Sequence, residues 1–312
     1  MGWLGLWVFH RAAGTARGGF IAKAAMTIGR WLAVHEIEPK SVSYDIMRNA
    51  VKILLAAAWV SALSPALAET NSVPHVYPNG FMMVSTLGNV LYRTLDAKYQ
   101  KVLDPNPVEV ENMDEPVITP IAFHEGDEKF GEVSISAGYI DLVNHIAHAK
   151  AIDRFQPGCF QQYVVNLSRA GEKDAPPELP NIVDSRYWTE DVMNDQASIF
   201  NQIIGMTMAL NLSHHYLGHY NKFSSQMLPG KLVPINSLLS QAEWEASVKA
   251  ATKNALNAAL GTDGPAALFE AIDKMPKRPS WTAFFVPPAA DLKKLNKQIK
   301  TYEDQFFHGK LD

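Results

Sequence analysis

Apolar residues recur along most of the chain at intervals of three and four, which is the spacing of one face of an α-helix. This spacing predicts helices over 81–103, 139–154, 190–222, 238–260, 264–274 and 288–307. The helix over 190–222 starts after Thr189, whose hydroxyl can accept a hydrogen bond from an otherwise unpaired backbone N–H. Its second half is apolar nearly all round, so we expect that half to be buried.

Two extended runs, 116–123 and 130–136, interrupt the helical pattern. In the second run Val133 and Ile135 alternate with polar neighbours, as in a half-buried strand. Because a short charged turn separates the runs, we expect a β-hairpin. We interpret the Pro-rich, acidic stretch before residue 116 as a connection, and 156–188 as a long surface insertion. The predicted fold class is α+β and predominantly helical, with a single domain over 69–312.

A different pattern precedes this domain and is typical of a signal peptide. The segment 47–68 has a short basic region, an apolar run from Ile53 to about Leu63, and Ala66-Leu67-Ala68 before Glu69. The apolar run is shorter than the roughly 20 residues that span a bilayer, and no later segment approaches that length. We therefore expect a periplasmic or secreted mature chain without a membrane span. We interpret Met47 as the true start and 1–46 as a doubtful extension.

Composition narrows the function classes. Of the 312 residues 47% are hydrophobic and 19% charged, which is typical of a folded globular protein. The net charge is −4 and no long run of Lys and Arg occurs, so nucleic acid is not an expected partner. Cys159 is the single cysteine, so an intramolecular disulfide is excluded. It has no basic neighbour that would favour a nucleophilic role.

The candidate chemistry lies near the end of the long helix. His215 and His219 are four residues apart, which on a helix places both imidazoles on one face. Glu243 follows a loop containing Gly and Pro, near the start of the next predicted helix. Two neutral imidazoles, one carboxylate and one open position are the usual ligands of a catalytic zinc ion. The sequence therefore predicts a Zn²⁺ site made by His215, His219 and Glu243.

Around these residues the chain resembles the gluzincin zinc peptidases of the CAAX prenyl protease and heat-shock membrane protease type. That family has a strand pair, a Gly and a helix, then a zinc helix with H-E-x-x-H, then E-aromatic-x-A-D on a later helix. Here 133–142 looks like the strand and small-Gly-x-Ile step, and 243–246 looks like the start of the third-ligand motif. The resemblance covers about 116–260 and implies a metallopeptidase-like domain that acts on or binds polypeptides.

Two departures from the family pattern put ordinary proteolysis in doubt. Tyr216 replaces the general-base glutamate of H-E-x-x-H, and Ser247 replaces the aspartate of the later motif. A phenol is protonated at neutral pH, so Tyr216 could donate a hydrogen bond to a zinc-bound oxygen but hardly accept a proton. Losing a positioned base typically lowers the rate by about 10²–10⁴. His214, Glu245 and Glu125 are conceivable substitutes, but the helical spacing aims neither of the first two well.

Three hypotheses follow. The first is an exported zinc-binding metallopeptidase-like protein with impaired or altered proteolysis, in which Tyr216 acts at the metal. The second is a catalytically silent protein of the same fold that holds an extended peptide by strand addition. The third is a metal-free helical protein whose histidines are structural. We interpret a further pair, His145 and His148, as structural.

Overall fold

The computed structural model describes residues 79–103, 108–113, 131–171, 174–226 and 233–311. Every described residue belongs to one compact unit, Leu54–Asp312. The predicted signal peptide over 47–68 and the stretch over 1–46 both lie outside the described residues.

The described part of the chain is predominantly helical, as the sequence predicts. Its α-helices are α3 (Gly80–Arg93), α4 (Ala97–Leu103), α5 (Ala137–Ile152), α6 (Cys159–Leu167), α7 (Glu190–Tyr216), α8 (His219–Lys222), α9 (Gln241–Asn257), α10 (Asp263–Lys274) and α11 (Leu292–Phe307). Short 3₁₀ turns occur at Ser185–Trp188, Ser224–Gln226, Ile235–Ser237 and Ser280–Phe284.

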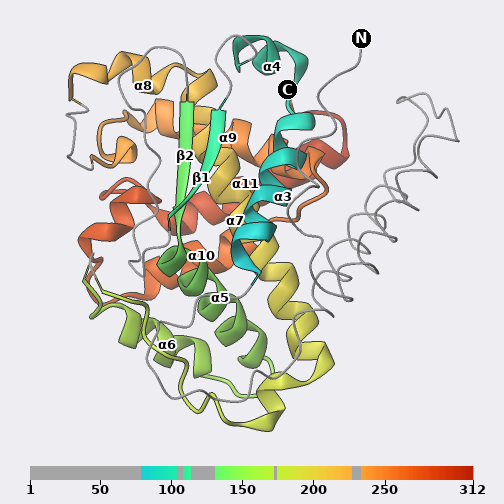
Figure 1. Cartoon of the computed structure of the whole chain (residues 1–312), viewed down its shortest axis with the longest axis vertical. Coiled ribbons are helices and arrows are strands. Elements are labelled where there is room, and N and C mark those ends of the chain that lie inside the picture. The colour runs from blue at the N-terminus through green and yellow to red at the C-terminus, as the bar shows by residue number, and fades with distance from the viewer. Residues whose placement is uncertain (1–78, 104–107, 114–130, 172–173, 227–232, 312) are drawn as a thin grey trace, which may run out of the picture. The chain divides into compact units, whose positions relative to one another are not determined.

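Helix α7 is the central element. It contacts α3, α5, α9 and α10, which lie around it in Figure 1. Its apolar second half is buried on every side, as expected of a helix with no polar face. Large, fully buried side chains from α7 and the elements around it fill the core: Tyr139, Phe160, Tyr163, Phe200, Trp244 and Trp281. The elements that carry the predicted site therefore rest on a packed framework.

Helix α10 approaches α7 closely through a glycine. A Cβ atom at Gly264 would lie 2.6 Å from the carbonyl oxygen of Ile199, so any larger residue would push the helices apart. The backbone N–H of Gly264 donates to Oε1 of Gln202 at 2.8 Å, which ties the start of α10 to α7.

The two strands do not form the expected hairpin. β1 (Val108–Met113) and β2 (Gly131–Ser136) pair in parallel, with Val110 opposite Val133. The predicted second strand is confirmed, but its described partner is a segment that we interpreted as a connection, and 116–123 lies outside the described residues. Parallel pairing requires the chain to cross back between the strands, which a tight turn cannot do.

Two predicted segments also differ from the structure. The region 81–103 is two helices instead of one, because the chain leaves the helix at Thr94, whose hydroxyl donates to the carbonyl oxygen of Val90 at 2.9 Å. The expected surface insertion 156–188 contains helix α6, of which Phe160, Tyr163 and Val164 are fully buried. Part of this segment therefore belongs to the core.

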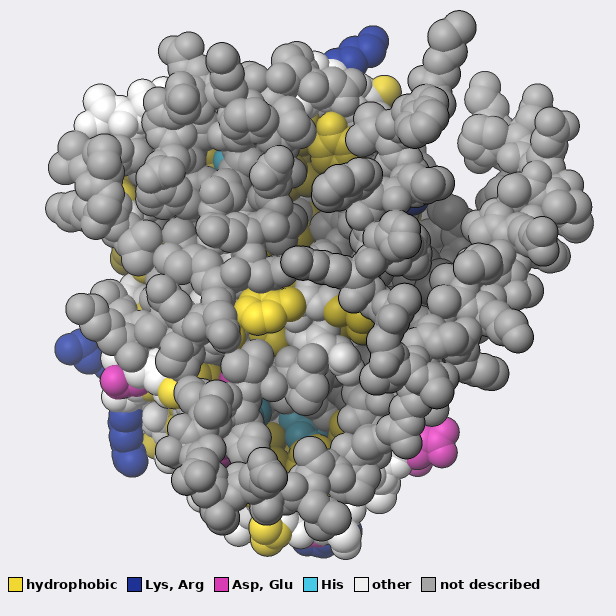
Figure 2. All heavy atoms as spheres, viewed as in Figure 1, with side chains coloured by type: hydrophobic (Ala, Val, Ile, Leu, Met, Phe, Trp, Pro, Cys, Tyr) yellow, Lys and Arg dark blue, Asp and Glu magenta, His cyan; other side chains and the backbone are white. Residues whose placement is uncertain are grey.

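No helix among the described residues is long and apolar enough to cross a membrane. On the face drawn in Figure 2, the described charged side chains of both signs lie near the edges and do not gather into a patch of one sign. This distribution agrees with the small net charge of −4.

Candidate functional site at the end of helix α7

The predicted pair His215 and His219 does not share one helix. Helix α7 ends at Tyr216, and the N–H of Gly218 donates to the carbonyl oxygen of His215 at 3.0 Å. Gly218 has φ +76°, the left-handed conformation that commonly ends helices at glycine, and α8 begins at His219. The prediction that both imidazoles lie on one helical face assumed a continuous helix over 190–222. The break after Tyr216 shows that this assumption is wrong.

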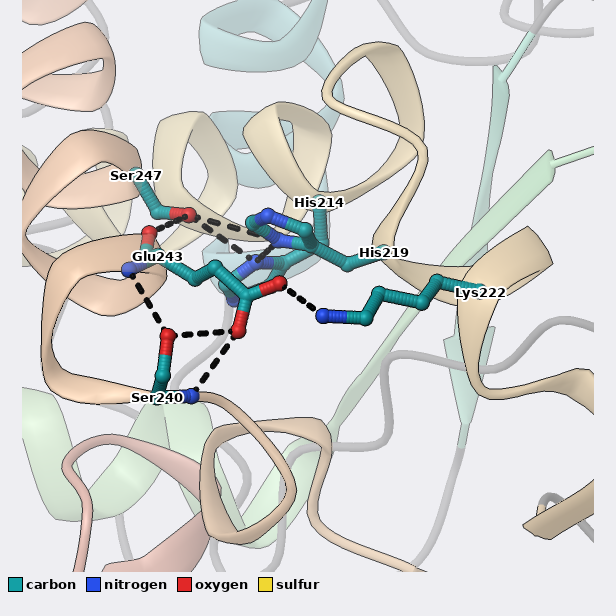
Figure 3. Close-up of polar contacts among 6 residues, drawn as sticks. All are labelled: His214, His219, Lys222, Ser240, Glu243 and Ser247. Atoms are coloured by element: carbon teal, nitrogen blue, oxygen red, sulfur yellow. Dashed lines mark hydrogen bonds and ion pairs between the residues drawn. The ribbon is translucent and has the colours of Figure 1, made fainter.

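The structure instead brings His214 and His219 together. Their Nδ1 atoms are 3.1 Å apart, and the ring centroids are 5.3 Å apart. Figure 3 shows the two rings next to each other beside α9, and their planes are tilted by 45°. The hydroxyl of Ser247 on α9 lies 3.4 Å from each Nδ1 and donates to the carbonyl oxygen of Glu243 at 3.1 Å. Two imidazole nitrogens and one hydroxyl oxygen thus surround one point.

Burial keeps this pair of imidazoles neutral at physiological pH. Burial lowers the pKa of His214 to about 3, with the neighbouring His219 and His215 acting in the same direction. Burial also lowers the pKa of His219, partly opposed by the charge of Glu243. A bond between the two Nδ1 atoms requires a proton on one and a lone pair on the other. Neutral imidazole is also the form that binds a metal ion.

The far side of the His214 ring is less well satisfied. Nε2 of His214 has no hydrogen-bond partner of normal geometry among the described residues, and neither has Oδ1 of the buried Asn236. Asn236 acts to raise the pKa of His214, against the effect of burial. The amide nitrogen of Asn236 donates to the carbonyl oxygen of Phe284 at 3.0 Å, which fixes the side chain.

Glu243 lies next to the histidine pair but has other partners. Its Oε1 accepts from Nζ of Lys222 at 2.5 Å, and its Oε2 accepts from the hydroxyl and the backbone N–H of Ser240 at 2.7 and 3.0 Å. With the return bond from its own N–H to the Ser240 hydroxyl, this is a capping box at the start of α9. The bonds from Lys222 and Ser240 lower the pKa of Glu243 to about 2.

The remaining predicted residues lie elsewhere. The half-buried ring of His215 packs on Tyr220 at 4.5 Å between centroids. The ring of Tyr216 stacks on Tyr99 of α4 at 4.1 Å, in an apolar cluster with Leu95, Leu103 and Leu212. Burial raises the pKa of Tyr216, and its hydroxyl has no hydrogen-bond partner among the described residues. The side chain of Tyr216 therefore packs against α4, and its role at the metal stays a prediction.

Of the three suggested substitute bases, only His214 is shown to lie beside His219. Glu245 accepts from the amide of Gln241 at 2.8 Å and lies 3.7 Å from Nζ of Lys294, on the α11 side of α9. Glu125 lies outside the described residues. Across the part of the chain that the structure describes, no group of three His, Cys, Asp or Glu side chains is placed to hold a metal ion. The predicted set of His215, His219 and Glu243 is thus not assembled as three ligands.

The sequence also carries signals for features that the predicted helix over 190–222 does not include. Gly218 follows the last helical residues as a typical helix-ending glycine, and Ser240-x-x-Glu243 matches the capping-box pattern. Together they predict a helix end after Tyr216 and a helix start at Ser240. The contact between His214 and His219 had no such signal, because it depends on the path of the chain through the turn.

No protein-family model, no curated protein and no solved structure matches this chain.

Proposed function

We propose that the protein is an exported, zinc-binding relative of the gluzincin metallopeptidases, with His214 and His219 as its histidine ligands and with impaired or altered peptide hydrolysis. Its partner is a polypeptide, bound as substrate or as ligand. Export rests on the sequence pattern over 47–68 alone. If export occurs by that signal, N-terminal sequencing of the exported protein will begin at Glu69.

The observation that carries the metal part is the 3.1 Å distance between the two Nδ1 atoms. Zinc binds imidazole nitrogen at about 2.0–2.1 Å, so two ligands of a tetrahedral ion lie about 3.3 Å apart. Both imidazoles are neutral, buried and supported by packed helices. The hydroxyl of Ser247 lies 3.4 Å from both Nδ1 atoms. The donor atoms therefore fit two positions of a zinc ion, with Glu243 nearby as the carboxylate.

The chemistry that a bound zinc ion supplies is activation of water and polarisation of a carbonyl group. The chain's own residues add little to peptide hydrolysis. Tyr216 packs on Tyr99, and the carboxylate of Glu243, which acts electrostatically on His219, is engaged by Lys222 and Ser240. Without a free carboxylate as general base, the rate falls by about 10²–10⁴, so binding of a polypeptide is favoured over turnover.

Zinc titration of the purified chain by calorimetry, together with elemental analysis, tests this proposal. We expect one zinc ion per chain, and a loss of affinity of about 100-fold or more in His214→Ala and in His219→Ala. His215→Ala is the matched control, because the sequence pattern makes it a ligand whereas its ring packs on Tyr220. It should bind zinc as the wild type does.

Each alternative has its own outcome. If wild-type protein holds no stoichiometric zinc, the histidines are structural and the metal proposal fails. If His215→Ala removes zinc and His214→Ala does not, the ligand pair read from the sequence is correct. Cleavage of unfolded casein that a chelator stops would contradict the loss of hydrolysis. Circular dichroism of each variant separates loss of ligand from loss of fold.

A further inference from the structure

The contacts of Lys222 concern the third ligand of the proposed site. Helix α8 carries His219 and Lys222 three residues apart, and these two side chains contact Ser247 and Glu243 of α9. Nζ of Lys222 lies 2.5 Å from Oε1 of Glu243. In Figure 3 the side chain of Glu243 runs beside the two imidazole rings, with its carboxylate turned to Lys222 and Ser240. One short helix therefore supplies a histidine of the site and the lysine that forms an ion pair with the neighbouring carboxylate.

The two oxygens of Glu243 have separate tasks. Oε2 accepts the two bonds from Ser240 that begin helix α9, and Oε1 accepts the bond from Lys222. Oε1 can therefore change its partner while Oε2 continues to cap the helix. A metal ion needs only one of these oxygens as a ligand.

Electrostatics also favours such an exchange. Two neutral imidazoles leave the charge of a divalent ion uncompensated, and a carboxylate is the usual third ligand beside two histidines. The ion pair itself is partly exposed, with 56% of the Lys222 side chain and 25% of the Glu243 side chain accessible. Ion pairs in contact with water contribute little, so breaking this one is a small obstacle.

We infer that Lys222 competes with the metal ion for Oε1 of Glu243 and thereby limits the affinity of the site. This inference rests on the proposed zinc site. If an ion bound here, Oε1 of Glu243 would leave Lys222 and would serve as its third ligand.

Zinc titration of Lys222→Met, compared with the wild-type chain, tests the competition. The variant loses the ammonium group and keeps most of the apolar stem, so we expect its zinc affinity to rise about three- to tenfold. Lys222→Arg keeps the charge and should bind nearly as the wild type does. Glu243→Gln should bind about 10–100-fold more weakly and should abolish the effect of Lys222→Met in the double variant.

Lys294→Met is the matched control. Lys294 lies 3.7 Å from Glu245, two residues after Glu243 on the same helix, but belongs to α11 and does not contact Glu243. Its removal should leave zinc affinity unchanged. An equal gain in this variant would show a general effect of charge and would overturn the competition.

The two proposals fail in different ways. If zinc binds and depends on His214 and His219, but Lys222→Met binds equally or more weakly, the competition is wrong and the zinc site stands. If neither the wild type nor Lys222→Met binds zinc, the zinc site itself is wrong.

Discussion

Two pairs of histidines lie in the described structure, and their geometries are opposite to what their spacings indicate. His145 and His148 are one turn apart on the continuous helix α5, yet each has its own neighbour. Nε2 of His148 donates to the carbonyl oxygen of Tyr187 at 2.7 Å, and the ring of His145 meets Tyr163 edge-on at 5.9 Å. His214 and His219 are five apart across a helix end, and their nitrogens are in contact.

The difference shows what each pair does for the protein. In the α5 pair, His148 contacts Tyr187 and Trp188 and holds their segment against the helical core, whereas His145 packs on Tyr163 of α6. The pair at the end of α7 contacts itself and the hydroxyl of Ser247, so it forms a small polar centre between α7, α8 and α9. Spacing alone predicts neither arrangement, because it says nothing of what packs against the helix.

The largest expected effect is on pH dependence, because burial lowers the pKa of all four histidines and takes that of His214 to about 3. The pKa of His214 falls from 6.5 to about 3 on folding, so the unfolded chain binds this proton more tightly. The contribution of neutral His214 to the free energy of unfolding is complete above pH 6.5. It is lost as the pH falls toward 3, by up to about 1.4 kcal/mol per pH unit. His214→Leu should flatten this slope in chelator-treated protein, as measured by urea unfolding at pH 4.5 to 7. Equal slopes for variant and wild type would contradict this prediction.

A smaller effect is expected for the α5 pair, on stability at neutral pH. His148→Ala leaves a cavity and an unsatisfied carbonyl oxygen at Tyr187, so the free energy of unfolding should fall by about 2–3 kcal/mol. His145→Ala removes a half-buried ring whose Nδ1 has no hydrogen-bond partner of normal geometry among the described residues, although the backbone of Pro177 acts to raise the pKa of His145, so it should cost about 1 kcal/mol. Urea unfolding at pH 7 measures both. Equal losses would show that the hydrogen bond to Tyr187 is not what distinguishes the two histidines.

The smallest effect is expected at the turn that creates the second pair. A Cβ atom at Gly218 meets nothing within 4 Å, so Gly218→Ala costs only the strain of φ +76°, about 1 kcal/mol. Gly218→Asn should cost about half as much, because asparagine tolerates this conformation better. Thermal unfolding should place the midpoint of the Asn variant between those of wild type and the Ala variant. If the Ala variant is as stable as the wild type, the turn is not strained and can adopt another path.

Much of the helical framework was predictable from the sequence, and the particular elements show why. Helices α5, α9 and α10 lie within about three residues of their predicted bounds, because apolar spacing and end signals agree there. The partner of β2 was not predicted, since it depends on which distant segment returns to pair with it. That the end of the long helix lies against the start of α9 was also predictable.

The identity of the paired histidines was not predictable, because it depends on one rotation of the chain at Leu217 and Gly218. On a continuous helix His219 would lie above His215. The left-handed residue turns His219 toward His214 instead, and Tyr216 is left facing α4. The proposals of zinc binding, lost hydrolysis and export remain predictions that the experiments above test.

The turn at Gly218 also determines how an ion at this place would act on the whole molecule. An ion held by His214 and His219 would join residues on either side of the turn, a cross-link that the unfolded chain cannot reproduce with the same affinity. Ligand that binds only the folded form adds to its stability, by about 2.7 kcal/mol when the free concentration is 100 times the dissociation constant. The occupancy of the site and the folded fraction of the protein would then be coupled, and thermal unfolding would release the ion.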